Sequence, residues 1–392
     1  MKIAVVHDYF TQQGGAEKVA EEMYRMADGA SLVSTVGIRN KMPPSLRDVP
    51  MQTSWMQSIP GIQKHYRLFF MLYPLAVRSL DLSQYDLVLS SSSGYAKGVQ
   101  TRPDALHVCY CHTPMRWVWN FDGYSEREGM SAAGRKVLGL MVRGLRHWDE
   151  SASRQPDHFV ANSKTVAKRI RDVYHRVAEV INPPIDVDRF RVSDQQDDYY
   201  ILLSRLIGYK RLDLAIEACS KLNRKLLVIG DGPYRERLMA MAGPSVQFMG
   251  RLSDSDVNHY VSRCRALIFP GEEDFGMAPL EVAAAGRPCI AYRAGGAEET
   301  IVDGRTGLFF DTQDPEDLMS AILRFEKQTW GTDELREHAE GFRTEVFQER
   351  MRTFLKRVGC PLPASTLPFR TQRPFSESGK VAAIAQDVRS AS

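Results

Sequence analysis

Short apolar runs alternate with helix-like segments along most of the chain. Runs of apolar residues bounded by polar or turn-forming residues predict buried strands, and apolar positions spaced three or four apart predict helices. Strands that alternate with helices are typical of parallel α/β sheets. In the first half we expect strands at residues 2–8, 31–37, 86–92, 106–112 and 158–163.

A stretch rich in Pro and Asp at 180–190 interrupts this alternation, and a charged polar segment follows it. We interpret the interruption as an interdomain linker over 183–198. We therefore predict two Rossmann-like, doubly wound domains at 1–182 and 199–340, with a ligand cleft between the carboxyl ends of their sheets. In the second half we expect strands at 199–206, 225–232, 246–250, 266–271, 288–292 and 307–311.

The end of the chain has a different pattern. Residues 333–358 are amphipathic, with Phe342, Phe347, Met351, Phe354 and Leu355 at helical spacing, so we expect one or two helices there. Beyond Gly359 the chain is rich in Pro, Ser and Thr. Such a composition cannot bury enough apolar surface to fold, so we predict a disordered tail at 359–392.

Composition narrows the class of protein. A length of 392 residues is too great for one ordinary core, and 43% hydrophobic with 25% charged residues is usual for a soluble globular protein. We find neither an apolar run of bilayer length nor a signal-peptide pattern. The six cysteines lack paired spacing, which favours reduced thiols and a cytoplasmic setting. No nucleic-acid partner is predicted.

Two stretches combine cations with apolar and aromatic residues. No acid occurs between Asp48 and Asp81, and 55–78 contains Lys64, Arg67 and Arg78; the segment 132–148 is likewise basic and free of acids. Such faces suit an anionic membrane surface. The alternative is that both are ordinary helices packed on their own domain, and the pattern does not decide between the two.

Two strand ends carry groups that suit a diphosphate. Gly14 and Gly15 follow the first strand and open a helix, whose N-terminal amides can bind phosphate. Arg205 and Lys210 follow the first strand of the second half and could neutralise a departing diphosphate. Taken alone, the first motif is also compatible with a plain strand-to-helix connection and the second with a pair of surface cations.

The segment "GEEDFGMAPLEVAAAG" at 271–286 sets Glu273 before a helix and Glu281 about two turns inside it. Carboxylates separated in this way can accept hydrogen bonds from hydroxyls at two points of one polyol ligand. Metal-site signals are weak by comparison: Asp186 and Asp188 lie in the linker, and "CYCH" at 109–112 lacks a second ligand pair. We predict no metal and no cofactor.

With these motifs in order, the chain resembles the retaining GT-B glycosyltransferases of family 4, also called group 1. The motifs are GGAEKV, SRLIGYKRLD, IGDGP, FMGRLSD, the E-x7-E block and AGGAEETI, and the resemblance covers about residues 2–358. It implies a GT-B fold whose C-terminal helix, at 341–358, returns to the first domain. It also implies transfer of a sugar from a nucleoside diphosphate with retention of anomeric configuration.

The resemblance also implies roles for particular residues. Glu281 would bind the donor ribose, Glu273 would bind the transferred sugar, and Arg205 and Lys210 would neutralise the leaving diphosphate. The catalytic set is then His112, Lys210 and Glu273, with His112 contacting the donor sugar. The remaining donor-binding residues would be Gly14, Gly15 and Ser163, which line the cleft, and the backbone amides of Phe275, Gly276, Met277 and Ala278.

Within the family, "HDYFTQQGGAEKV" and "CYCHTPMRWVW" are similar to bacterial mannosyltransferases of exopolysaccharide and O-antigen assembly, including those acting on cellobiosyl-diphosphopolyprenol. That similarity implies GDP-mannose as donor, a polyprenyl-diphosphate-linked sugar as acceptor, and a peripheral position on the inner face of the cytoplasmic membrane. A transferase that uses a UDP-sugar, a nucleotide-sugar 2-epimerase and a catalytically silent binding protein are the alternatives.

Overall fold

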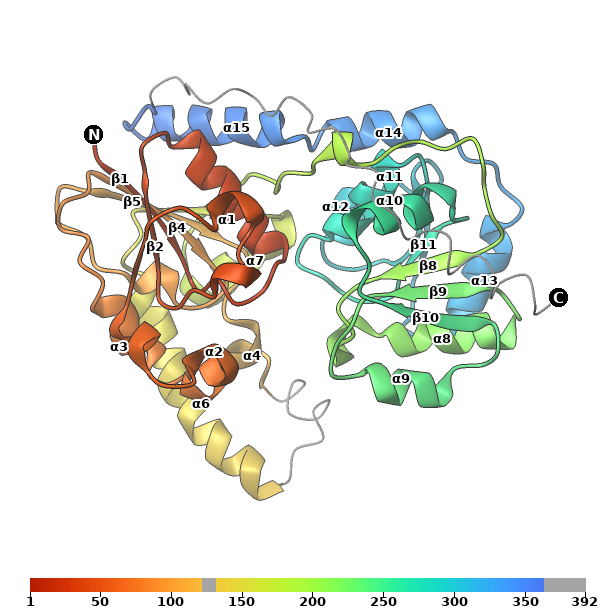
Figure 1. Cartoon of the computed structure of the whole chain (residues 1–392), viewed down its shortest axis with the longest axis horizontal. Coiled ribbons are helices and arrows are strands. Elements are labelled where there is room, and N and C mark those ends of the chain that lie inside the picture. The colour runs from red at the N-terminus through yellow and green to blue at the C-terminus, as the bar shows by residue number, and fades with distance from the viewer. Residues whose placement is uncertain (122–131, 363–392) are drawn as a thin grey trace.

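The computed structural model describes residues 1–121 and 132–362, and most of the predicted tail at 359–392 lies outside these residues. Two α/β domains stand side by side, each built on its own parallel sheet (Figure 1). This confirms the prediction of two Rossmann-like domains.

The first sheet contains every strand expected in the first half and two more at its edges. Its order is β3-β2-β1-β4-β5-β6-β7, and all neighbours are parallel. The unexpected edge strands are β3 and β7. The bounds are β1 Ile3–His7, β2 Ser31–Ser34, β3 Met51–Thr53, β4 Leu87–Ser92, β5 Leu106–Cys111, β6 His158–Ala161 and β7 Ala178–Val180.

The second sheet contains the strands expected in the second half. Its order is β10-β9-β8-β11-β12-β13, again parallel throughout. The bounds are β8 Tyr200–Leu203, β9 Leu226–Ile229, β10 Val246–Gly250, β11 Leu267–Phe269, β12 Cys289–Tyr292 and β13 Gly307–Phe310.

Helices cover both faces of each sheet, because apolar strands whose side chains point to both faces need cover on both sides. The longer helices of the first domain are α1 Gly15–Met26, α3 Tyr73–Arg78, α6 Ala132–Ala152 and α7 Lys164–Tyr174, with the short α2 Ile62–His65 and α4 Arg116–Trp119 between them. The second domain has α8 Leu212–Lys221, α9 Arg235–Met241, α10 Asp254–Arg263, α11 Met277–Ala284, α12 Ala297–Thr300, α13 Pro315–Phe325 and α14 Thr332–Glu340.

Alternation along β1 shows how the first core is divided. Ile3 and Val5 point to one face, where they join a cluster with α1 and the C-terminal helix α15 (Thr344–Arg357). Ala4 and Val6 point to the other face and join a cluster with α3 and α6. Successive side chains of a strand alternate between faces, so one apolar run supplies two cores.

The chain crosses between the domains at two adjacent places. Ile185, on the first crossing, donates its backbone N–H to Phe342 O on the second at 2.8 Å. Both terminal guanidinium nitrogens of Arg343, Nη1 and Nη2, donate to the Asp188 carboxylate at 2.9 Å. After the second crossing α15 runs along the first domain (Figure 1), where Gln348 Nε2 donates to Glu22 Oε2 at 3.0 Å. The last described helix therefore ties the two crossings to the first domain.

Candidate active site

The candidate site lies where the carboxyl ends of the two sheets face each other. Gly14 and Gly15 follow β1 and begin α1, and the segment from Glu273 to Ala278 follows β11 and begins α11. A Cβ on Gly15 would lie 2.7 Å from Met277 Sδ, so the two loops lie against each other. The predicted diphosphate loop of the first domain thus meets the predicted sugar-binding loop of the second.

Lys210 and Glu273, distant in sequence, form an ion pair in this region. Lys210 Nζ lies 2.7 Å from Glu273 Oε1, and the two side chains are 17% and 20% exposed. Gly271 allows this approach, because a Cβ there would lie 2.7 Å from Lys210 Cα. Burial lowers the pKa of Lys210, but the attraction of Glu273 and Tyr209 outweighs it and holds the pKa above its usual value. Lys210 is therefore a fixed positive charge.

Glu281 forms a second ion pair, and this one joins the domains. Lys18 Nζ, on α1, donates to Glu281 Oε1, on α11, at 3.0 Å. Burial raises the pKa of Glu281, but Lys18 and then Arg189 oppose this and hold the pKa below its ordinary value. Glu281 is thus an ionised acceptor for hydroxyls at neutral pH, and it lies on the same helix whose first turn follows Glu273.

The loop between the two glutamates is held in shape by its packing. Gly276 is the N-cap of α11 and has a left-handed backbone, with φ +84°, which favours glycine. Phe275 is buried, with its ring 5.9 Å from that of Phe342. Gly296 N donates to Glu273 O at 2.8 Å, and any Cβ on Gly296 would overlap the Phe275 backbone. The first amides of α11, those of Met277 and Ala278, lack intrahelical acceptors and are available to a ligand.

Arg205 and Ser163 both bridge the domains but make different contacts from Lys210. Arg205 is exposed, and its Nη1 donates to Gln12 Oε1, next to Gly14, at 3.0 Å. Ser163 is the N-cap of α7: Val166 N donates to its hydroxyl at 3.0 Å, and that hydroxyl lies 2.5 Å from Asp274 O. Ser163 therefore holds the loop that contains Glu273.

His112 follows β5 and is largely enclosed, with 8% of its surface exposed. Its Nε2 lies 2.8 Å from Ser91 Oγ, and Asn162 Nδ2 donates to its carbonyl oxygen at 2.9 Å. Burial, and then the charge of nearby His7, lower the pKa of His112 to about 3. His112 is therefore neutral at physiological pH, able to accept or donate one hydrogen bond through its free ring nitrogen.

The sequence analysis missed a cluster that clamps the domains together. Asp274 Oδ1 accepts from Arg116 Nη2 at 2.6 Å and also from Arg169 Nη1, while Arg169 Nη2 donates to Glu272 Oε1 at 2.8 Å. The guanidinium of Arg116 stacks over the Tyr209 ring at 4.7 Å. Both arginines come from the first domain and both acids from the second, so each bond crosses the cleft.

A second missed bridge uses a helix terminus. Glu299, on α12, accepts from Lys164 N at 2.8 Å with one oxygen and at 3.0 Å with the other. Thr165 N also donates to it, at 3.3 Å. These are free amides in the first turn of α7, where the helix dipole favours a negative charge. Glu299 belongs to the "AGGAEETI" motif, but nothing in the motif indicated a partner in the other domain.

The residues that gave weak metal signals have other partners. Asp188 binds Arg343, and Cys109 and Cys111 are buried on β5, where burial raises the pKa of the Cys109 thiol to about 12. Among the residues at 1–121 and 132–362, no group of three His, Cys, Asp or Glu side chains could hold a metal ion.

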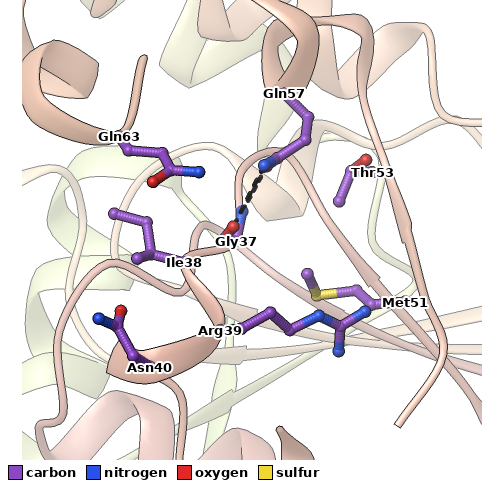
Figure 2. Close-up of a pocket in the computed structure, with 8 residues that line it drawn as sticks. All are labelled: Gly37, Ile38, Arg39, Asn40, Met51, Thr53, Gln57 and Gln63. Carbon is purple, nitrogen blue, oxygen red and sulfur yellow. Dashed lines mark hydrogen bonds between the residues drawn. The ribbon is translucent and has the colours of Figure 1, made fainter. Parts of the chain in front are cut away.

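A hollow of about 460 Å³ lies at the carboxyl edge of the first sheet, beside the segments that follow β2 and β3 (Figure 2). The Gln57 amide exchanges hydrogen bonds with the Gly37 backbone, at 2.8 Å and 3.3 Å. Gln13, from the loop before Gly14, donates at 3.1 Å to the backbone oxygen of Met42, two residues after the lining residue Asn40. The hollow is lined by both polar and apolar groups, from Gly37, Ile38, Arg39, Asn40, Met51, Thr53, Gln57 and Gln63.

Comparison with family models identifies the chain. A model of Glycosyltransferase Family 4 matches residues 13–189, and a model of Glycosyl transferases group 1 matches residues 186–341. The two matches meet at the first crossing and together run through both domains. The chain belongs to the family 4, group 1 glycosyltransferases.

The individual relatives are distant from this chain. The uncharacterized glycosyltransferase MJ1178 of Methanocaldococcus jannaschii is 24% identical over 192 residues, 48% of this chain and 54% of the relative. A GDP-mannose-dependent alpha-(1-6)-phosphatidylinositol monomannoside mannosyltransferase of Mycolicibacterium smegmatis is 30% identical over 175 residues, 37% of this chain and 46% of the relative. The chain thus spans about half the length of the curated relatives it matches.

A solved structure supports the fold over most of the length of this chain. HepE (Alr3699) of Anabaena, in complex with UDP, has a TM-score of 0.67 with 17% sequence identity, covering 91% of this chain and 100% of HepE. Together with the two parallel sheets, this confirms the expected GT-B architecture.

Proposed function

We propose that the protein transfers a hexosyl group from a nucleoside diphosphate sugar to a glycan acceptor, with retention of anomeric configuration. The observation that carries the proposal is the meeting of Lys210, Glu273 and Glu281 around the start of α11. Glu273 and Glu281 offer acceptors for sugar and ribose hydroxyls, and Lys210 offers a fixed positive charge. The family match supports the proposal that this arrangement is a donor site.

Transfer breaks the bond between the anomeric carbon and the diphosphate and forms a bond from that carbon to an acceptor hydroxyl. The acceptor proton passes to the departing phosphate. Lys210, Arg205 and the first amides of α11 would stabilise the charge that develops on the diphosphate. The residues of the cleft thus position both reactants and supply electrostatic stabilisation.

We propose GDP-mannose as the donor. The sequence resemblance to mannosyltransferases supports it, as does a relative named for its dependence on GDP-mannose. A UDP-sugar is the second candidate, because the similar HepE structure contains UDP.

A donor screen tests both candidates. We expect GDP and GDP-mannose, but not UDP or UDP-glucose, to raise the melting temperature of the full chain in EDTA, because a ligand that binds only the folded state stabilises it. Glu281→Gln should weaken nucleotide binding about tenfold, since it removes a charged acceptor. Glu217→Gln, on α8 and paired with Lys221 at 3.0 Å, is the control. Stabilisation by the UDP ligands alone would overturn the proposed donor and keep the donor site, whereas no binding of any nucleotide would overturn the proposed function.

We propose a polyprenyl-diphosphate-linked sugar as the acceptor, reached from the inner face of the cytoplasmic membrane. No helix in the described part of the chain is long and apolar enough to cross a membrane. The region of α2, α3 and α6, which are labelled in Figure 1, has exposed apolar side chains and exposed cations. The apolar residues are Trp55, Leu68, Met71, Leu75, Leu140 and Met141, and the cations are Lys64, Arg67, Arg78, Lys136 and Arg143.

Two interpretations of the basic stretches, packing on their own domain and contact with a membrane, each have support in this region. Ile62, Ala76 and Val142 are buried in one cluster, so the helices do pack on their own domain. Leu68 and Leu75, however, are 75% and 58% exposed, and burial in the domain does not account for them. Apolar side chains flanked by cations are suited to the interface of an anionic bilayer. The hollow lined by Asn40, Gln57 and Gln63 is a place for acceptor sugars near that surface.

Sedimentation with vesicles tests the membrane surface. We expect the protein to bind vesicles that contain anionic phosphatidylglycerol and to bind neutral phosphatidylcholine vesicles weakly. The double variant Leu68→Ser, Leu75→Ser should reduce binding about tenfold or more, because each loses apolar area that would enter the bilayer. Exposed Val177, which directly precedes β7 at the edge of the first sheet opposite β3, gives the control Val177→Ser. Equal binding by both variants would contradict the proposal.

A further inference from the structure

Behind His112, buried polar side chains form a row that leads back into the first domain. Ser91 Oγ lies 2.8 Å from His112 Nε2 and 3.0 Å from His7 Nδ1. On the other side of the His7 ring, Nε2 lies 4.0 Å from Glu17 Oε1. His7, Glu17 and Ser91 are all at most 3% exposed. We call Glu17, His7, Ser91 and His112 the buried relay.

The sheet fixes the spacing within the buried relay. His7 ends β1 and is the register partner of Ser91 on β4. His112 directly follows Cys111, which is paired with Ser92 of β4, and Glu17 lies in the first turn of α1. The relay therefore joins the two strand ends and the helix that border the candidate donor site.

Glu17 is unusual for a buried acid. Its Oε2 is enclosed and has no hydrogen-bond partner in the described part of the chain, and a Cβ on Gly14 would lie 2.9 Å from that oxygen. An unsatisfied buried carboxylate costs stability. Keeping one directly below the predicted diphosphate loop indicates a role other than stability.

Counting protons along the relay determines the direction of its hydrogen bonds. A carboxylate can only accept, so Glu17 favours a proton on His7 Nε2 by electrostatic attraction across the 4.0 Å gap. His7 Nδ1 is then an acceptor, and the single hydroxyl proton of Ser91 points to it. Ser91 Oγ in turn accepts a hydrogen bond from His112, whose proton must lie on Nε2. Because His112 is neutral, its Nδ1 keeps a lone pair.

We propose that Glu17, His7 and Ser91 are positioning residues that hold His112 in its Nε2–H tautomer, so that Nδ1 accepts a hydrogen bond from a hydroxyl of the transferred sugar. His112 Nδ1 has no partner within the described residues and is not among the enclosed polar atoms. A sugar with a carboxylate or keto oxygen at that position would place acceptor against acceptor and bind poorly. The selectivity for a sugar hydroxyl depends on the proposed function, whereas the tautomer of His112 does not.

Nitrogen-15 spectra of the histidine rings test the tautomer directly on the full chain, without any substrate. The His112 signals are assigned as those lost in His112→Gln. We expect them to show a protonated Nε2 and an unprotonated Nδ1 at pH 7.5. A proton on Nδ1 of His112 would overturn the proposal.

Two variants test whether Glu17 acts through Ser91. In Glu17→Gln the amide can donate to His7, so the His112 signals should move toward the Nδ1–H form. In the Ser91→Ala background the same replacement should leave the His112 signals unchanged. Glu21→Gln, on α1 but paired with Arg25 outside the relay, is the matched control. An equal effect of Glu17→Gln with and without Ser91 would contradict the relay.

Kinetics then connect the tautomer with the sugar. We expect Glu17→Gln to lower kcat/KM about tenfold, the equivalent of one lost hydrogen bond, with nucleotide affinity unchanged. Glu21→Gln should have wild-type kinetics. An unchanged kcat/KM together with a shifted tautomer would overturn the hydroxyl contact alone. If no nucleotide sugar serves as donor, the proposed function fails, and the tautomer result still stands.

Discussion

Replacing Lys210 with Ala is expected to lower kcat by about 10²–10³-fold, the usual effect of removing one group that stabilises developing charge. Glu273→Ala should cause a similar loss, because the pair is 2.7 Å apart and each partner orients the other. Transfer of radiolabelled sugar at saturating donor measures both effects. Affinity for the free nucleoside diphosphate should fall in Lys210→Ala and stay near wild type in Glu273→Ala, since the proposed contact of Glu273 is with the sugar.

Conservative variants separate charge from shape. Lys210→Arg keeps the charge and should retain more activity than Lys210→Ala, and Glu273→Gln keeps hydrogen-bonding capacity but loses the ion pair. The double variant Lys210→Ala, Glu273→Ala should lose less than the product of the single losses, because the two residues act as a unit. Far-ultraviolet circular dichroism of each variant checks the fold. Near wild-type transfer by the double variant would remove both residues from the catalytic set.

The hydrophobic pattern predicted the central strands because each is an apolar run buried on both faces. The strands β3 and β7 escaped prediction because "MQT" and "AEV" are short, half-buried and at the edges of the sheet. At such positions the neighbouring strand, rather than the intrinsic preference of the residues, decides whether a segment pairs. The hydrophobic pattern alone did not indicate the second crossing, which only the family resemblance implied, because Ile185 and Phe342 are far apart in the sequence.

Motifs predicted the parts of the site that lie within one local segment. Gly276 and the start of α11 follow from a turn and a helix that the sequence itself encodes. The contacts that cross the cleft were not predictable, because Arg116, Arg169 and Asp274 have no common spacing or motif. The relay behind His112 was missed for the same reason: Ser91 and His7 meet only through the register of β1 and β4.

Replacing Asp274 with Ala is expected to open the cleft. Asp274 accepts hydrogen bonds from Arg116 and Arg169 of the first domain. Without the carboxylate, each guanidinium group loses this partner in the second domain. Burial lowers the pKa of Arg116, but Asp274 outweighs this and raises it, so the arginine stays charged and must be rehydrated. We expect a larger radius of gyration by small-angle X-ray scattering and a kcat/KM about 10²-fold lower, because small displacements of reacting groups are costly.

Asp198→Ala is the matched control, because Asp198 pairs with Arg265 within the second domain, at 2.9 Å, and bridges nothing across the cleft. It should leave both the radius of gyration and kcat/KM unchanged. Glu299→Gln removes the charge at the start of α7 and should add to the opening seen in Asp274→Ala, since the two bridges share no residue. A saturating donor should partly close the variants again, because a ligand that contacts both domains favours the closed form. Wild-type scattering and kinetics in the combined variant would mean that these two acids do not hold the domains together, and that the catalytic geometry depends on other contacts between the domains, such as that of Lys18 with Glu281.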